Sequence, residues 1–201
     1  MERSPICSRT GSLQLSGGLM PRRENAQNRK GQPRPQRPGH VLVVCGGQRT
    51  EPDYFAGLRI SRQARLKVRV KADSPENLVK YAKSVFSKDE YDAAWCVVDV
   101  DHFDIDAATR LAAQSGIELA VSNPCFEVWL LLHHVDHKAF VKDGKAACAL
   151  LGKHVPGYDK KLDFAVFEAG VEAAVERAKA LDEPGNPSTG VWRLVENLLS
   201  R

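Results

Sequence analysis

Two aspartates stand where they can converge on one metal ion. Asp99 and Asp101 follow the apolar run of residues 95–98, so they lie at the carboxyl end of a predicted strand. Side chains two positions apart on an extended chain point the same way, and two convergent carboxylates repel each other unless a cation or a proton lies between them. Mg²⁺ suits such a pair, because it takes oxygen ligands and is completed by water and substrate phosphate. The other interpretation is a turn whose acids cap the next helix, but the position at a strand end favours the metal site.

Two glutamates can complete this site. Glu51 follows the turn after the first apolar run. It is either a third ligand that also orients a water or a favourable charge at a helix N-terminus, and its position alone favours the second. Glu127 lies within the apolar run of residues 125–132, where a carboxylate needs a partner. A metal ion and a basic side chain explain Glu127 about equally well.

Polar and basic side chains indicate a nucleic-acid partner in two places. Gln48 and Arg49 follow Gly46 and Gly47, which let the backbone approach a phosphate, although the GK[ST] ending of a P-loop is absent. The segment of residues 59–71 holds six basic side chains and no acid. Three of them alternate with apolar residues along a predicted edge strand: Lys67, Arg69 and Lys71. They either follow a nucleic-acid backbone or protect the sheet edge from pairing, and the second interpretation is slightly favoured.

Three histidines near the end of the apolar segment also invite a metal interpretation. His133 and His137 are one helical turn apart, and His134 lies between them. The HExxH pattern of a zinc protease is absent. The favoured interpretation is therefore a polar helix terminus whose histidines complement the helix dipole.

Alternating patterns supply the elements that must position these residues. Four strands are predicted, each followed by a helix, at residues 41–45, 66–71, 93–98 and 117–121. Strands that alternate with helices predict an α/β three-layer domain with a mainly parallel four-stranded sheet flanked by helices. Additional C-terminal helices are predicted at residues 145–151, 163–181 and 187–199. Thr50 is expected to cap the first helix and Asn186 the last.

The basic charge of the chain comes from its first segment. Residues 1–39 hold eight Lys or Arg and two Glu, a net charge of +6, which leaves −2 for residues 40–201 of a chain whose net charge is +4. The segment has no hydrophobic periodicity, so it is predicted to be a disordered basic tail ahead of one domain. It is either an electrostatic arm for nucleic acid or a solubilising leader, two interpretations of about equal weight. Met20 is an alternative start to Met1.

Composition excludes several classes of protein. The five cysteines form no CxxC pair, which argues against a zinc cluster or a disulfide framework. We find neither a secretory signal nor an apolar run as long as a membrane span. The expectation is a cytoplasmic protein without a membrane partner.

Four segments together resemble the RloB-like family, which is associated with bacterial phage defence by abortive infection and is related to the Toprim fold. They are VLVVCGGQRTEPDYF, CVVDVDHF, SNPCFEVWLLLHH and NPSTGVWRLVENLL, and with their spacing they span about residues 40–199. The resemblance implies a Toprim-like domain. Toprim-related enzymes place a glutamate after the first strand and a DxD pair after a later one, and they bind Mg²⁺ for phosphodiester chemistry.

The resemblance assigns site residues at matching positions. The DxD pair corresponds to Asp99 and Asp101, the TEP motif to residues 50–52, and the helical glutamate to Glu127. The first-strand glutamate has no counterpart, because the family reads C-E-G where this chain has C-G-G, with Gly46 in the place of the acid.

These residues support two main hypotheses. The first is a phage-defence nuclease dependent on Mg²⁺ or Mn²⁺, in which Glu51, Asp99, Asp101 and Glu127 are catalytic and the last three bind the metal. The second is a catalytically degraded sensor or adaptor that binds nucleic acid or a nucleotide, because Gly46 replaces the expected acid. A weaker third hypothesis is an interaction scaffold that uses the exposed sheet edge. Partner proteins of a defence system are a further expectation.

Overall fold

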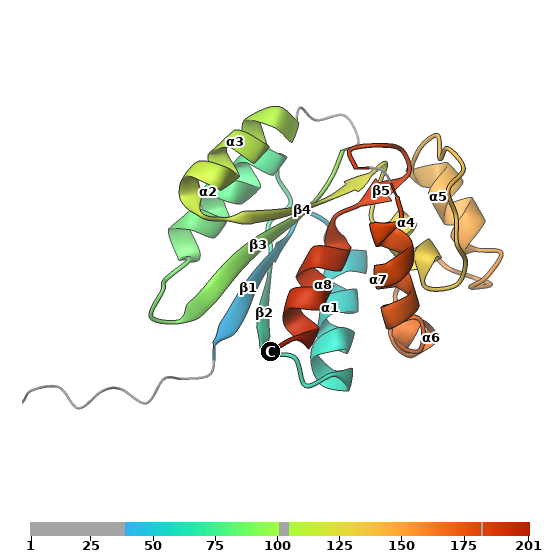
Figure 1. Cartoon of the computed structure of the whole chain (residues 1–201), viewed down its shortest axis with the longest axis horizontal. Helices are drawn as coiled ribbons and strands as arrows, with labels where there is room; N and C mark the ends of the chain where they lie inside the picture. Colours follow the sequence, from blue (N-terminus) through green and yellow to red (C-terminus); the bar gives the residue numbers. More distant parts are fainter. Residues whose placement is uncertain (1–38, 101–104, 182) are drawn as a thin grey trace, which may run out of the picture. The chain divides into compact units, whose positions relative to one another are not determined.

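The computed structural model describes residues 39–100, 105–181 and 183–201, which form an α/β domain (Figure 1). The elements are β1 (His40–Cys45), α1 (Thr50–Ser61), β2 (Leu66–Val70), α2 (Pro75–Val85), β3 (Tyr91–Asp99), α3 (Ile105–Ser115), β4 (Glu118–Asn123), α4 (Glu127–Leu132), α5 (Gly144–Leu151), α6 (Ala165–Glu168), α7 (Val171–Lys179), β5 (Ser188–Thr189) and α8 (Val191–Leu199). Within these ranges no helix has the length and apolar character needed to cross a membrane. Asp101 and the predicted tail, apart from Gly39, lie outside the described residues.

Helices cover both faces of the sheet, which confirms the predicted three layers (Figure 1). The strand order is β2-β1-β3-β4-β5, and β1 to β4 run parallel. The even-numbered residues Leu42 and Val44 of β1 pack with α2 and α3. Its odd-numbered apolar residues pack with α1, α4, α7 and α8. Because both faces of β1 are covered, the strand is continuously apolar and fully buried from Val41 to Cys45.

The sheet contains a fifth strand, so the prediction of four strands is incomplete. Strand β5 pairs antiparallel with the end of β4, and the hydroxyls of Ser122 and Thr189 lie 2.9 Å apart in a hydrogen bond. This pairing holds Ser188 and Thr189 extended, so the helix predicted over residues 187–199 begins only at Val191. Two polar residues have no hydrophobic periodicity, which is why the sequence pattern did not reveal this strand.

Two further predictions about the C-terminal helices are wrong. The helix predicted over residues 163–181 is divided into α6 and α7 at Gly170, where a Cβ atom would lie 2.4 Å from the backbone oxygen of His133. Only a residue without a side chain fits this close approach to the end of α4. Asn186 does not cap the last helix, because its amide binds the backbone N–H and C=O of Val141 instead.

The parallel strands end at one edge of the sheet, where the candidate residues follow them. Cys45 of β1 pairs in register with Val97 of β3, and Asp99 pairs with Ser122 of β4. The N–H of Gly46 donates to the C=O of Val97 at 3.1 Å, so the turn after β1 is fixed beside β3. This geometry brings the β1–α1 turn and Asp99 together.

Candidate functional site

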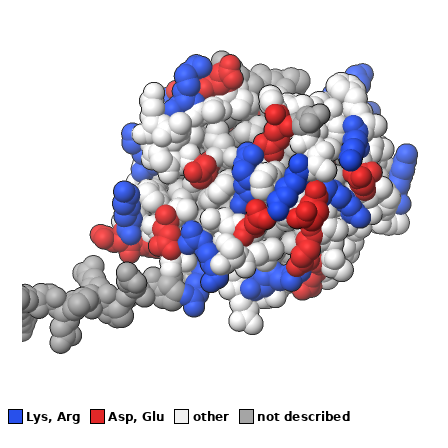
Figure 2. Space-filling model, in the orientation of Figure 1, with Lys and Arg blue, Asp and Glu red and all other residues white. Residues whose placement is uncertain are grey.

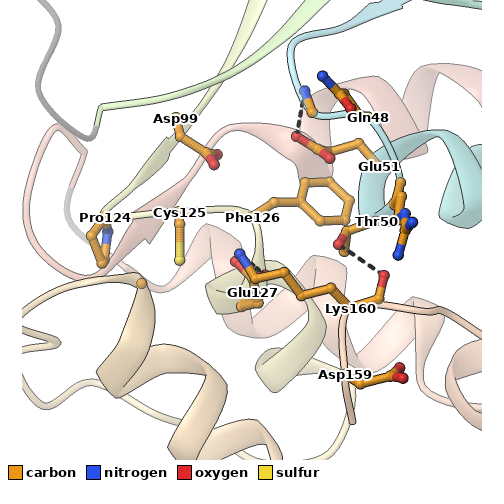
Figure 3. A pocket seen from close by; sticks show the side chains of 13 residues that line it. Gln48, Thr50, Glu51, Asp99, Pro124, Cys125, Phe126, Glu127, Asp159 and Lys160 are labelled. Carbon is orange, nitrogen blue, oxygen red and sulfur yellow. Dashed lines mark hydrogen bonds and ion pairs between the residues drawn. The ribbon is translucent and has the colours of Figure 1, made fainter. Parts of the chain in front are cut away.

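A pocket of about 410 Å³ opens at the carboxyl ends of the parallel strands (Figure 3). Its walls come from the β1–α1 turn, the end of β3, the segment before α4 and the loop between α5 and α6. It brings together five residues predicted from the sequence: Gln48, Arg49, Glu51, Asp99 and Glu127. Glu51 and Asp99 also line a neighbouring pocket of about 190 Å³, so they lie between the two.

Glu51 is buried in the first turn of α1, with its carboxylate folded back onto the preceding turn. The residue is 5% exposed, and its Oε1 accepts a hydrogen bond from the N–H of Gly47 at 3.1 Å. Burial raises the pKa of Glu51 above its ordinary value of 4.5, and the nearby carboxylate of Glu127 adds to this rise. Glu51 therefore lies in the first turn of a helix and also lines the pocket, and its role as a metal ligand stays a prediction.

Thr50 does not cap α1 as predicted. The N-cap position is Arg49, and no side chain caps the helix there. The hydroxyl of Thr50 donates instead to the backbone C=O of Lys160 at 3.4 Å. This contact ties the start of α1 to the loop that forms the opposite wall of the pocket.

Glu127 is buried at the start of α4 and has basic and hydroxyl partners. Its Oε1 lies 3.7 Å from Nζ of Lys160 and accepts a hydrogen bond from the hydroxyl of Tyr158 at 3.5 Å. The thiol of Cys125 lies in the same wall, and burial raises its pKa, with the charges of Glu127 and Asp99 adding to the rise. Of the two partners expected for Glu127, the described residues supply the basic one.

A family model described as RloB-like protein matches residues 41–198 of the chain. The chain belongs to this family. The match covers most of the sequence, confirms the family predicted from the four segments, and supports a phage-defence-type protein. Searches among curated proteins and among solved structures returned no significant match.

In this RloB-like chain the Glu51 carboxylate lies beside the glycine pair that follows β1. A Cβ atom on Gly47 would lie 1.8 Å from Oε2 of Glu51, so the Glu51 carboxylate occupies the space directly over that residue. A Cβ atom on Gly46 would meet no atom closer than the C=O of Val97 at 3.4 Å. The turn therefore accommodates the Glu51 side chain from α1 because Gly47 has none of its own.

The carboxylates in the pocket suit a hard divalent cation. Glu51, Asp99 and Glu127 offer only carboxylate oxygens, which Mg²⁺ and Mn²⁺ accept as ligands. Across residues 39–100, 105–181 and 183–201, no group of three or more His, Cys, Asp or Glu is arranged to hold a metal ion. Mg²⁺ is commonly bound through one or two carboxylates plus substrate phosphates, so a pair is sufficient. Asp99 and Glu51 line both pockets and could supply such a pair, while Oε1 of Glu127 lies 3.7 Å from Nζ of Lys160; the metal-ligand assignments stay predictions.

The basic residues predicted to bind nucleic acid lie in two different places. Gln48 and Arg49 are exposed at the pocket. Lys67, Arg69 and Lys71 belong to or follow β2, whose predicted position at the sheet edge is confirmed. Lys67 pairs with Glu90 at 3.3 Å and Lys71 with Asp73 at 3.5 Å. Basic and acidic side chains are interspersed over the face seen in Figure 2, so this face has no continuous basic surface.

His133 is not part of a polar helix end as predicted. The residue is 5% exposed, its Nδ1 lies 2.8 Å from the C=O of Phe167, and its Nε2 lies 3.3 Å from the hydroxyl of Tyr54. Burial lowers the pKa of His133 to about 4, so the ring is neutral near pH 7. Its role is to complete a buried aromatic cluster with Tyr54, Trp129 and Phe167.

Two residues that were not predicted as site residues contact Glu127 at the pocket. Tyr158 and Lys160 lie in the loop between α5 and α6 and reach the candidate site only through the fold. Lys160 and Lys161 are adjacent in the sequence and belong to no recognisable motif. The one available signal was that Glu127 required a partner, which did not indicate which of the many basic residues it would be.

Replacement of Glu51 by glutamine should remove the part of the pH dependence of the free energy of unfolding that ionisation of Glu51 causes. Because the pKa of Glu51 is raised in the folded state, ionisation of this carboxyl opposes folding, and the Glu51 contribution to the free energy of unfolding should fall as pH rises above about 4.5. Glutamine keeps an oxygen for the Gly47 N–H but cannot ionise. In urea denaturation with EDTA, the free energy of unfolding of the variant should gain on that of the wild type as pH rises above about 4.5. The exposed Glu118→Gln is the control, and parallel curves for Glu51→Gln and wild type would contradict the prediction.

Proposed function

We propose that this RloB-like protein cleaves phosphodiester bonds of nucleic acid with Mg²⁺ or Mn²⁺, as a phage-defence nuclease related to the Toprim enzymes. The position of Glu51 carries the proposal. Its carboxylate lies against Gly47 at the end of β1 and lines the same two pockets as Asp99. An acid is thus present beside the position where Gly46 removes one from the family pattern.

The residues of the pocket have distinct roles in this proposal. Asp99 and Glu51 hold the metal, and Asp101, which lies outside the described residues, is expected to join them. A bound ion would lower the pKa of its water and stabilise negative charge on the phosphate. Burial favours the protonated form of Glu51, so this side chain should release its proton when a cation binds. Gln48, at the mouth of the pocket, is placed to donate a hydrogen bond to a phosphate oxygen.

The nuclease activity is tested with the purified full chain. Single-stranded DNA, double-stranded DNA and RNA should each be incubated with Mg²⁺, Mn²⁺ or EDTA, and Mn²⁺ binding should be measured by calorimetry. We expect metal-dependent cleavage of at least one substrate and none in EDTA. If the protein shows no cleavage and no Mn²⁺ binding under any of these conditions, the proposal is overturned.

The second candidate function is a catalytically degraded nucleic-acid or nucleotide sensor, and Gly46 is the observation that favours it. A side chain fits at this position, since the nearest atom to a Cβ is 3.4 Å away. Gly46→Glu therefore restores the acid of the family pattern without a steric conflict at Cβ. Cleavage by Gly46→Glu but not by the wild type would identify a degraded site. Cleavage by both would favour the nuclease.

A further inference from the structure

The backbone of Lys160 has an unusual conformation that fixes it at the mouth of the pocket. Its φ angle is +69°, in the left-handed region that residues with a side chain seldom adopt. Its C=O accepts a hydrogen bond from the hydroxyl of Thr50, which belongs to α1. Such outliers persist only where the surrounding structure imposes them, and they concentrate at ligand-binding sites.

The side chain of Lys160 extends across the pocket toward Glu127 (Figure 3). The two partners differ sharply in exposure, because the Glu127 side chain is 6% exposed and that of Lys160 is 63% exposed. The Glu127 carboxylate raises the pKa of Lys160, so the ammonium remains charged. The ion pair therefore keeps an exposed, charged ammonium at the pocket, where a bound anion would compete with Glu127 for it.

Arg49 places a second cation in the same pocket from a distant part of the chain. It is exposed at the β1–α1 turn, whereas Lys160 lies in the loop after α5. The described lining thus combines buried or half-buried acids from the strand and helix ends, Glu51, Asp99 and Glu127, with two exposed cations and the exposed Asp159. Lys160 is paired with Glu127 and is otherwise largely exposed, so its ammonium is placed for an anionic group beside one held at Asp99 and Glu51.

We propose that Lys160, together with Arg49, binds the phosphate group next to the one held at Asp99 and Glu51, so that the pocket takes a polynucleotide strand and not an isolated phosphate ester. This inference rests on the proposed function for the location of the first phosphate. It adds the substrate class and assigns Lys160 to substrate binding. An ammonium and a guanidinium are the usual side chains for phosphate contacts.

We call Lys160 and Arg49 together the clamp. Binding measured without cleavage tests it. The affinity of the full chain for a short single-stranded oligonucleotide should be followed by fluorescence anisotropy in Ca²⁺ over a series of salt concentrations. Each phosphate contact contributes about 0.7 to the slope of log affinity against log salt on a single strand. Lys160→Gln and Arg49→Gln should each weaken binding and reduce the slope by about 0.7. Lys161→Gln, the exposed neighbour, is the matched control and should change neither.

Glu127→Gln separates a phosphate clamp from a contact that only fastens the loop. Glutamine removes the anion that competes with phosphate for Lys160, so the clamp predicts tighter oligonucleotide binding. A contact that only fastens the loop predicts that Glu127→Gln and Lys160→Gln both weaken binding with an unchanged salt slope. That second pattern would overturn the inference.

Cleavage then shows whether the clamp acts beside the reacting phosphate. Lys160→Gln should lower kcat/KM about tenfold for an oligonucleotide and leave cleavage of bis(p-nitrophenyl) phosphate, which has no neighbouring phosphate, unchanged. An equal loss on both substrates would contradict the assignment. If the wild type cleaves nothing but the salt slopes change as expected, the nuclease proposal fails and the clamp stands.

Discussion

Replacement of Asp99 by asparagine should abolish metal-dependent cleavage, with a loss of roughly 10³-fold in kcat/KM. Asp99 ends β3 at the edge of the sheet and lines both pockets that meet at Glu51. Asparagine has nearly the same shape but no charge, so it removes the attraction for a divalent cation without altering the packing. The cleavage rate and the Mn²⁺ affinity measured by calorimetry should fall together, while an unchanged melting temperature shows that the fold is retained.

Asp159→Asn is the matched control for this experiment. Asp159 lines the same pocket but lies in the exposed loop between α5 and α6. The same change of chemistry there should leave Mn²⁺ binding within about twofold of the wild type. A fall in cleavage for Asp99→Asn with Mn²⁺ affinity unchanged would show that Asp99 acts in some way other than as a metal ligand.

The sequence predicted the sheet wherever burial imposed a pattern. Strand β1 is apolar at every position from Val41 to Cys45 because helices cover both its faces. Strand β2 lies at the edge and alternates in sequence, although its burial falls steadily from Leu66 to the exposed Val70. Strand β5 was not predicted because a hydrogen bond between the hydroxyls of Ser122 and Thr189 holds it in place, and apolar packing does not. The break at Gly170 depends on the backbone of His133, which lies 37 positions earlier in the chain, so no local pattern encodes it.

The candidate site was predictable in its residue types but not in its pairings. Strand ends in a parallel sheet meet at one edge, which is why Glu51 and Asp99 could be expected near each other. The partner of Glu127 was left open, because Lys160 reaches it from a loop whose backbone adopts a positive φ. His133 shows the same limit, since a histidine at the end of a helix is exposed or buried according to what packs over it.

Replacement of Gly47 by alanine should strongly reduce cleavage while preserving the fold. The new Cβ would lie 1.8 Å from Oε2 of Glu51 and 2.3 Å from its carboxyl carbon, so the carboxylate must move. The displaced group is the end of a flexible side chain, and φ of Gly47 is not positive, so stability should change by no more than about 1 kcal/mol. Loss of a group that holds a metal ligand in position typically costs about 10- to 100-fold in metal affinity or activity, and Gly47→Ala acts on the position of Glu51 in this way.

Gly46→Ala is the adjacent control that makes this prediction decisive. It introduces the same methyl group one residue earlier, where the nearest atom is 3.4 Å away, so Glu51 stays in place and activity should remain within about twofold of the wild type. Glu51→Gln keeps the side chain over Gly47 but removes its charge, so it should resemble Gly47→Ala in cleavage and Mn²⁺ affinity. If Gly47→Ala and Gly46→Ala are equally active, the position of the Glu51 carboxylate does not matter for catalysis. The acid missing at Gly46 would then have no substitute, and the sensor would become the better account of this chain.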